Sequence, residues 1–166
     1  MNICKLTVPE ETCCFTGHRK ILQSDEETLP MRLDATVREL YERGVRHFRC
    51  GGALGFDTLS AITVLRLRTE APDARLVLVL PCRGQAAGWS AGDRQLYERI
   101  LARADEVVYA SVEYSRESMM IRNRALVDGS GVCVAYMNSV TGGTAYTVRY
   151  AKRSFAEVIN LGSLDI

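Results

Sequence analysis

Short runs of apolar residues alternate along the chain with longer stretches in which apolar residues recur every three or four positions. A short apolar run predicts a buried strand, and the longer period predicts a helix with one buried face. The segment Ala74–Leu80 (ARLVLVL) is apolar at nearly every position, which is typical of a strand covered on both faces. The segment Leu29–Arg43 has its apolar residues at helical spacing and stops before Gly44.

The complete pattern predicts strands and helices in regular alternation. The strands are expected at Thr12–Thr16, Val45–Cys50, Ala74–Leu80, Glu106–Ala110, Val132–Tyr136 and Glu157–Leu161. The helices are expected at Leu29–Arg43, Phe56–Thr69, Ala91–Ala104, Ser118–Val127 and Thr144–Arg153. Strands that alternate with helices are joined by right-handed crossovers and form a parallel sheet. The sequence therefore predicts one doubly wound α/β domain over residues 1–166, with a mostly parallel sheet of about six strands and helices on both faces.

Polar and glycine-rich segments follow five of the predicted strands. In chain order they are TGHRK, CGGALGFD, PCRGQAAGW, SVEYSRESM and TGG. Ligands of open α/β sheets bind in the crevice beyond the carboxyl ends of the strands. All five segments are expected at that edge of the sheet, so we predict that the ligand site lies there.

The composition is that of an ordinary globular domain. The 166 residues are 47% hydrophobic and 25% charged, which is enough apolar material for a core. The net charge of +1 argues against a large basic surface for coating DNA, although it leaves room for a small basic pocket. The start MNICKLTVPEE lacks the apolar stretch of a signal peptide, and no apolar run approaches membrane-spanning length. We therefore expect a cytoplasmic protein with no membrane association.

The cysteines are expected to be reduced and mostly buried. None stands in a C-x-x-C pair, and only His18 and His47 are available to support a zinc site. We therefore expect no metal site and interpret the cysteines as small apolar residues in a reducing compartment. They are Cys4, Cys13, Cys14, Cys50, Cys82 and Cys133.

Three glycines and an aspartate follow the second predicted strand. Gly51, Gly52 and Gly55 relax the steric limits on the backbone, so we expect another group to approach this segment closely. Backbone N–H groups at the start of a helix suit a phosphate or carboxylate. The carboxylate of Asp57 in the first helical turn competes with such an anion. Three alternative roles for Asp57 are to cap the helix, to bind a ribose hydroxyl, and to accept hydrogen bonds from the loop amides. Tight packing together with a helix cap explains the same pattern without a ligand.

The loops after the first and fifth strands also suit an anionic ligand. The first loop combines a hydroxyl, bare backbone, an imidazole and a guanidinium in Thr16, Gly17, His18 and Arg19. The last loop places Gly142, Gly143 and Thr144 at the start of a helix, where free N–H groups attract anions. A basic surface turn and an ordinary helix cap are the alternative explanations of these two loops.

The loop after the third predicted strand supplies further candidate ligand residues. Pro81 ends the third strand, and Gln85 and Trp89 follow it. The indole of Trp89, the only tryptophan, either stacks on a base or packs the loop.

The fourth predicted helix carries the sequence RNRALVD. It contains Arg122, Asn123, Arg124 and Asp128. The two arginines point about 200° apart on a helix, so only one of them faces a given pocket. We expect the other to pair with an acid such as Asp128.

No nucleophile and base stand in a recognisable catalytic arrangement. His18, Asp57 and Asp128 are the candidate acids and bases, and they are too few and too scattered to assign a reaction. The catalytic residues and any cofactor are therefore unknown at this stage.

Taken in order, the segments TGHR, GGALGFD, P-C-x-x-Q, RNRALVD and GGTAYT resemble the SLOG superfamily of Rossmann-like domains, and most of all its YpsA-like branch of small bacterial proteins. The resemblance covers the chain from Cys13 to Leu161. It implies a Rossmann-like fold and a nucleotide or nucleotide-derived ligand at the carboxyl edge of the sheet. It also implies a homo-oligomer, most often a dimer.

Two better-understood families are similar in part. The DprA/Smf family binds single-stranded DNA, and its G-x-A-x-G-x-D pattern is similar to the segment from Gly51 to Asp57 here (GGALGFD). This chain lacks room for the extra domains of that family and lacks excess positive charge. The LOG family splits nucleoside monophosphates at the glycosidic bond, but its catalytic glutamate has no counterpart near TGGTAYTV, so that activity is not carried over.

The sequence therefore favours a sensor or ligand-processing protein that binds a nucleotide-like small molecule. The alternatives are a hydrolase of a nucleotide derivative that uses Asp57 or Asp128, and a DprA-like module for single-stranded DNA. Nucleic acid is the least favoured partner, because positive and negative charges are nearly balanced.

Overall fold

The structure is a computed structural model that describes residues 8–166. The strands are β1 (Thr12–Gly17), β2 (His47–Cys50), β3 (Arg75–Leu80), β4 (Glu106–Tyr109), β5 (Val132–Tyr136) and β6 (Glu157–Asn160). The helices are α1 (Thr28–Glu42), α2 (Phe56–Leu67), α3 (Ala91–Arg103), α4 (Arg116–Val127) and α5 (Gly142–Arg153), with short 3₁₀ helices η1 (Pro9–Glu11) and η2 (Gln23–Asp25). The sequence pattern predicts every one of these strands and α-helices, with ends at most two residues away, but neither 3₁₀ helix.

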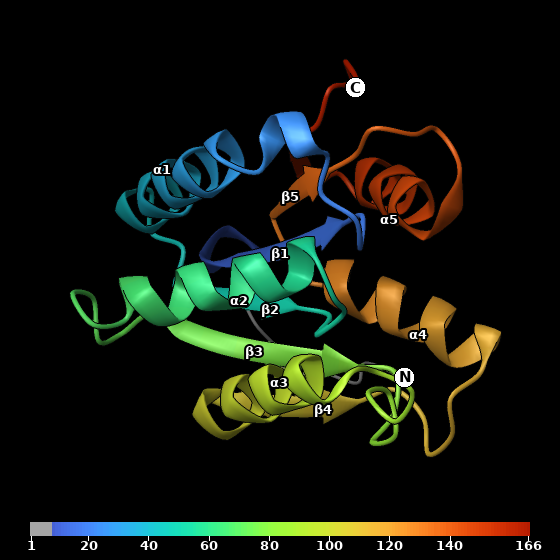
Figure 1. Cartoon of the computed structure of the whole chain (residues 1–166). Coiled ribbons are helices and arrows are strands. Elements are labelled where there is room, and N and C mark those ends of the chain that lie inside the picture. Colours follow the sequence, from blue (N-terminus) through green and yellow to red (C-terminus); the bar gives the residue numbers. More distant parts are fainter. Residues whose placement is uncertain (1–7) are drawn as a thin grey trace.

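The strands form one sheet in the order β4-β3-β2-β1-β5-β6, and every pairing is parallel. The prediction of a doubly wound, Rossmann-like α/β sheet is confirmed. From β1 the chain builds outward through β2, β3 and β4, and then crosses to place β5 on the other side of β1 (Figure 1). The strand order reverses between β1 and β5, and ligands of such sheets bind at this reversal.

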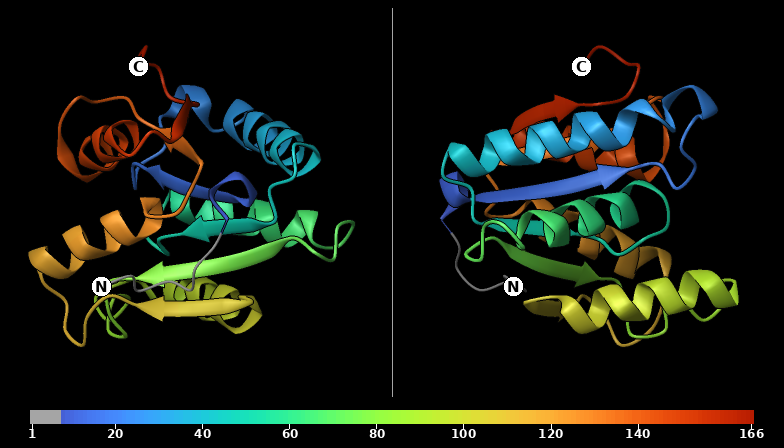
Figure 2. Two further views of the ribbon diagram at one scale, coloured as in Figure 1. Left: turned by 180° about the vertical axis from the view of Figure 1, so that it is seen from behind. Right: turned by 60° about the vertical axis from the view of Figure 1, so that its left-hand side comes forward.

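The helices form a layer on each face of the sheet. One layer contains α1, α2 and α3, and the other contains α4 and α5 (Figure 2). Helix α2 packs on β1, β2 and β3, whereas α4 packs on β1 and β3 and α5 on β1, β5 and β6. Both layers therefore reach the central strand β1.

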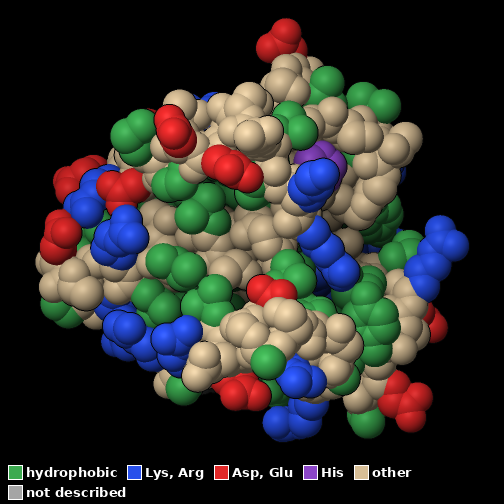
Figure 3. Space-filling model, in the orientation of Figure 1, with side chains coloured by type: hydrophobic (Ala, Val, Ile, Leu, Met, Phe, Trp, Pro, Cys, Tyr) green, Lys and Arg blue, Asp and Glu red, His purple; other side chains and the backbone are tan. Residues whose placement is uncertain are grey.

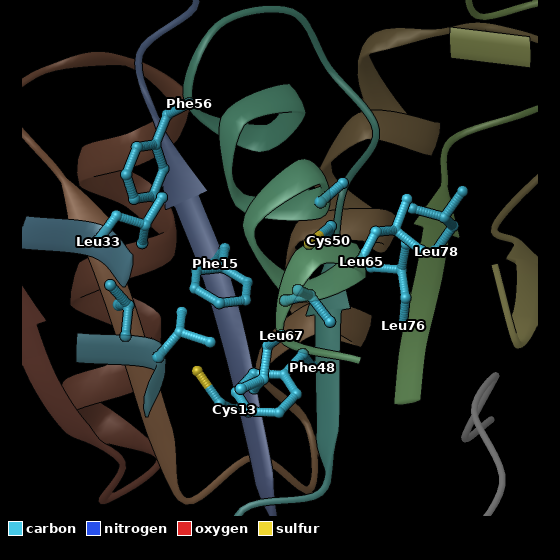
Figure 4. Close-up of a cluster of buried hydrophobic side chains, with 14 of the residues drawn as sticks. Cys13, Phe15, Leu33, Phe48, Cys50, Phe56, Leu65, Leu67, Leu76 and Leu78 are labelled. Carbon is cyan, nitrogen blue, oxygen red and sulfur yellow. The ribbon is translucent and has the colours of Figure 1, made fainter. Parts of the chain in front are cut away.

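Alternate residues of β1 enter two different cores. Cys13 and Phe15 point into the cluster under α1 and α2, where the Phe15 ring lies 6.3 Å from that of Phe48 and 6.4 Å from that of Phe56 (Figure 4). Cys14 points into a second cluster with Leu126 of α4 and other residues. Burial on both faces explains why β1 has no alternation of apolar and polar residues.

The described cysteines are free and buried, as the sequence predicts, whereas Cys4 lies outside the described residues. Basic and acidic side chains are interspersed over the face shown in Figure 3. None of the helices in residues 8–166 is long and apolar enough to span a membrane.

Candidate functional site

A cavity of about 250 Å³ opens at the carboxyl ends of the strands, where the strand order reverses. Its walls come from the end of β1, the β2–α2 loop, α4 and the start of α5, which meet around the tip of β1 in Figure 1. The residues that line it are Thr16, Gly17, His18, Arg19, Ala53, Asp57, Met119, Arg122, Asn123, Gly143 and Thr144. All of them except Met119 are candidate ligand residues from the sequence, so four segments distant in the chain form one site.

The side chains of Arg122 and Asp57 form an ion pair in the wall of this cavity. The Arg122 Nη1 atom lies 3.4 Å from Asp57 Oδ2, and the exposed fractions of the two side chains are 6% and 5%. Asp57 Oδ2 also accepts a hydrogen bond of 3.2 Å from the backbone N–H of Ala53. Asp57 therefore holds both the β2–α2 loop and the arginine of α4.

Burial is the largest influence on the pKa values of both Asp57 and Arg122. Burial raises the pKa of Asp57, while Arg122 and the Ala53 N–H act in the opposite direction. Burial lowers the pKa of Arg122, and Asp57 acts in the opposite direction. The Arg122 Nε atom is also buried and has no hydrogen-bond partner among the described residues. A buried cation with an unused N–H donor is stabilised by a further acceptor, so this side of the cavity favours an anion.

The glycines of the β2–α2 loop make room for the protein's own groups. A Cβ atom at Gly51 would overlap the Arg122 guanidinium, and one at Gly55 would overlap the backbone carbonyl of Arg19. Gly52 and Gly55 have φ angles of 68° and 77°, which favour glycine. The close approach expected from the sequence is therefore made by Arg122 and Arg19, and the packing alternative accounts for these glycines.

The start of α5 presents unused backbone donors to the cavity. Ser90 and Ser115 cap the first turns of α3 and α4 with their side chains, whereas Thr141 makes no such bond at α5, and neither do the N-cap residues of α1 and α2. Gly143 and Thr144 of this first turn line the cavity. An uncapped helix start carries N–H donors and partial positive charge, and both stabilise an anion.

His18 and Arg19 complete the wall beside β1. His18 Nε2 accepts a hydrogen bond of 2.9 Å from the backbone N–H of Asn138, so Nδ1 carries the ring proton of the neutral imidazole. Burial lowers the pKa of His18, which keeps the ring neutral at pH 7. The Arg19 side chain is exposed and has no carboxylate within ion-pair distance among residues 8–166. Arg19 is thus an exposed cation without an ion-pair partner among residues 8–166, and His18 is a neutral donor.

Arg122 and Arg124 point in different directions, as the helical spacing predicts. Arg122 faces the cavity, whereas Arg124 is exposed and donates a hydrogen bond of 2.7 Å from Nε to the Tyr146 hydroxyl. Asp128 does not pair with either arginine through its carboxylate; it accepts a hydrogen bond of 2.8 Å from the Tyr150 hydroxyl. The acid that pairs with an arginine of this helix is Asp57, so the expected pairing with Asp128 is not found.

The candidates of the third loop also lie outside the cavity wall. The Gln85 Nε2 atom donates a hydrogen bond of 2.6 Å to the Gly52 carbonyl, so Gln85 supports the β2–α2 loop without lining the cavity. Trp89 packs edge-on against Tyr97 with 5.3 Å between ring centroids, which matches the loop-packing alternative. Pro81 is buried, and its carbonyl accepts the N–H of Ser111. Gly142, with a φ of 90°, precedes the cavity-lining residues of α5.

Met119 is the cavity residue that the sequence does not indicate. Its Sδ atom lies 3.8 Å from Arg122 Nη2, one turn away on α4. A methionine on a helix is usually a core residue, so only the helix orientation identifies it. Among the described residues, no group of three or more His, Cys, Asp or Glu side chains is placed to hold a metal ion.

This fold, with its cavity at the strand reversal, defines a Rossmann-like α/β protein. A protein-family profile described as the YspA SLOG family (YpsA) matches residues 13–160, and the chain belongs to that family. The predicted resemblance to the YpsA-like branch of the SLOG superfamily is confirmed.

Two bacterial relatives are similar over most of this sequence. The SPbeta prophage-derived protein YoqJ of Bacillus subtilis (strain 168) is 28% identical over 137 residues, which cover 75% of this chain and 80% of the relative. A UPF0398 protein of Bacillus anthracis (strain A0248) is 28% identical over 161 residues, which cover 95% of this chain and 85% of the relative.

Two solved structures share the fold. DNA processing protein A of Helicobacter pylori, described for its single-stranded DNA binding mode, has a TM-score of 0.69 and 18% identity, over 95% of this chain and 67% of its own. DNA processing protein A of Streptococcus pneumoniae has a TM-score of 0.65 and 16% identity, over 96% of this chain. The chain spans 52% of the Streptococcus protein, which therefore contains other parts besides this fold.

Proposed function

We propose that the cavity binds the phosphate-bearing end of a nucleotide-derived small molecule. The observation that carries the proposal is the buried guanidinium of Arg122, whose Nε has no partner and which shares one wall with the uncapped start of α5. Arg122 is paired with Asp57 through Nη1, but its Nε donor has no acceptor among the described residues, and no side chain caps the start of α5. A phosphate supplies the acceptors that they lack.

The charges around the cavity support an anionic ligand. Arg19 and Arg122 contribute two positive charges, Asp57 contributes one negative charge, and His18 is neutral. The wall therefore carries an excess of one positive charge before a ligand binds. Thr16, Asn123 and Thr144 add neutral side chains that bind phosphate or ribose oxygens.

The size of the cavity limits what it encloses. At about 250 Å³ it lies below the range of roughly 300–1,000 Å³ of sites for drug-sized ligands, so only part of a nucleotide fits inside. We assign the phosphate and sugar to the cavity and place the base outside it. Tyr114, an exposed residue near Arg122 on the loop before α4, is the aromatic side chain available there, because Trp89 is engaged with Tyr97.

A hydrolase of the same ligand is the catalytic version of this proposal. Its acid or base would be Asp57, because Asp128 lies outside the cavity and is bound to Tyr150. Asp57 is held by Arg122 and by the Ala53 N–H, which is an arrangement suited to positioning rather than to attack. We therefore rank binding above turnover.

Single-stranded DNA is the second candidate ligand. The observation that favours it is the shared fold with DNA processing protein A, one of whose structures is described by its single-stranded DNA binding mode. The half-enclosed cavity and the even charge balance favour the small molecule over a polymer.

Isothermal titration calorimetry against AMP, ADP, ADP-ribose, cyclic dinucleotides and a single-stranded oligonucleotide tests these alternatives. The variant Arg19→Gln removes an exposed cavity arginine, and Arg124→Gln is its matched control outside the cavity. We expect one nucleotide to bind and Arg19→Gln to weaken it about tenfold, with Arg124→Gln unchanged. If no small molecule binds, or if both variants act alike, the proposal is wrong. If only the oligonucleotide binds, with a steep dependence on salt, DNA is the ligand.

Product analysis of the same mixtures separates binding from hydrolysis. Formation of a free base or of inorganic phosphate that is lost in Asp57→Asn, at a temperature where circular dichroism shows this variant to be folded, assigns turnover to this site. The cytoplasmic location and the homodimer remain predictions, and light scattering of the purified chain tests the dimer.

A further inference from the structure

A groove between α2 and α3 lies outside the cavity at the carboxyl edge. It encloses about 360 Å³, and none of its lining residues lines the other cavity. Its floor is aliphatic and consists of Ile62 and Leu65 from α2 and Leu96 and Ile100 from α3. Figure 3 shows apolar side chains between these two helices, with basic side chains beside them.

Three arginines form the rim of this groove. Arg66, Arg99 and Arg103 line it and are exposed, and no acidic residue lines it. Within residues 8–166, no carboxylate lies within 4.0 Å of any of these three guanidinium groups. The rim therefore has three positive charges that the protein does not neutralise.

Other arginines of this layer do have acidic partners. Arg38 pairs with Asp34 and Glu70, and Arg68 pairs with Asp105. Arg94 of α3 also lacks an acidic partner among the described residues, so the groove is distinguished by the gathering of three such arginines around an apolar floor. Unneutralised charge around an apolar floor indicates a surface that meets an acidic, apolar partner.

The residues of α3 are arranged in two parallel rows. Leu96 and Ile100 form an apolar row, and Arg99 and Arg103 form a basic row, each with the four-residue spacing of neighbours on a helix surface. A second helix that lies along α3 has the same repeat. Its apolar residues would meet the first row and its carboxylates the second.

We propose that this groove binds an acidic amphipathic helix of a partner protein. Helices bind grooves of this kind through apolar residues spaced three or four positions apart, and flanking charges set the orientation. Single-stranded nucleic acid is less well suited, because its bases stack on aromatic rings and none lines the groove. The inference does not depend on the ligand of the carboxyl-edge cavity.

Fluorescence anisotropy with a labelled helical peptide tests the proposal on the full chain. The probe has leucines at positions i, i+4, i+7 and i+11 and glutamates on the flanks of this stripe. Two comparison peptides replace the glutamates by lysines or the leucines by serines. We expect saturable binding of the first peptide, with a Kd below about 100 µM, and none of either comparison peptide.

Charge reversal on the protein supplies the matched control. The triple variant Arg66→Glu, Arg99→Glu, Arg103→Glu should weaken the peptide at least about tenfold. The triple variant Arg116→Glu, Lys152→Glu, Arg153→Glu changes the net charge equally at exposed positions of α4 and α5 and should bind normally. Amide chemical shifts should change along α2 and α3 when the peptide is added.

Each contrary result overturns the proposal. Absence of saturable binding, equal loss in both triple variants, or shift changes elsewhere on the molecule would each exclude a specific peptide groove. Binding of a single-stranded oligonucleotide at these residues in place of the peptide would assign the groove to nucleic acid.

Discussion

The Arg122 guanidinium lies 3.4 Å from the Asp57 carboxylate, and the two side chains link α4 on one face of the sheet to the first turn of α2 on the other. Both groups are almost fully buried at the cavity wall. The pair spans the carboxyl end of the sheet and joins the two layers at the place where we expect a ligand. Its strength should therefore affect both stability and binding.

Removal of the acid should destabilise the protein strongly. In Asp57→Asn the Arg122 charge stays buried without a counter-charge, and loss of one partner of a buried pair costs about 3–5 kcal/mol. Urea unfolding measures this change in the free energy of unfolding. Glu70→Gln, which breaks the exposed pair with Arg38, is the control and should have little effect. Equal effects of the two changes would contradict a structural role for the buried pair.

A methyl group at Gly51 should displace Arg122. The Cβ atom of Gly51→Ala would overlap the guanidinium and lie 2.7 Å from Asp57 Oδ2, so the pair must move at a cost of about 1–3 kcal/mol. Gly84→Ala adds the same atom where nothing lies within 4 Å and should be nearly neutral. Thermal unfolding compares the two variants, and a stable Gly51→Ala protein with unchanged ligand affinity would refute the packing seen here.

Binding of a sulfate ion should strengthen as the pH falls from 8 to 5.5. An anion beside Asp57 raises the pKa of this carboxyl further, because like charges repel, so binding takes up a proton and low pH favours it. His18 also favours sulfate binding at low pH, because its ring becomes positively charged when the pH falls below its lowered pKa. Sulfate is a suitable probe because its own charge is constant over this range.

Calorimetry of two variants separates the contributions to this pH dependence. Asp57→Asn should reduce the slope of affinity against pH, because it removes the carboxyl whose pKa the anion raises, and His18→Gln should reduce the slope at the acidic end. A slope that neither change alters would show that sulfate binds elsewhere.

Replacement of Phe155 by glycine should stabilise the fold. Phe155 has a φ of 62° and its side chain is 97% exposed, so it has the conformational cost of a left-handed residue without packing in return. We expect Phe155→Gly to raise the free energy of unfolding by up to about 1 kcal/mol. Phe155→Ala keeps the Cβ atom and should give no gain. If alanine and glycine act alike, backbone strain is not the cause.

Much of the fold is predictable from the sequence, because a strand that is buried on both faces has apolar residues at nearly every position. Val132–Tyr136 is predicted with its correct ends, and the other strands are nearly so. The strand order is not predictable in this way, since the parallel pairing of β1 with β5 joins segments more than 100 residues apart. The short η1 and η2 helices leave no periodic pattern and are missed.

The candidate site is predictable as a set of loops but not as a set of contacts. Helical spacing alone shows that Arg122 and Arg124 diverge, but only the packing of α4 on the sheet decides which of them faces the cavity. The same packing brings Met119 into the wall and leaves Asp128 outside it. Trp89 contacts Tyr97 because its loop folds back on α3, and nothing in the neighbouring sequence encodes that path.

The central position of β1 has a consequence for the order in which the protein is completed during synthesis. The pairings among the first four strands all join neighbours in sequence, so this part of the sheet is able to assemble before β5 is released from the ribosome. The cavity also requires α4 and the start of α5, which emerge after these four strands. A nascent chain that stops short of α5 would therefore possess most of its sheet but an incomplete cavity wall, so the ligand binding that we propose would require synthesis to continue at least into α5.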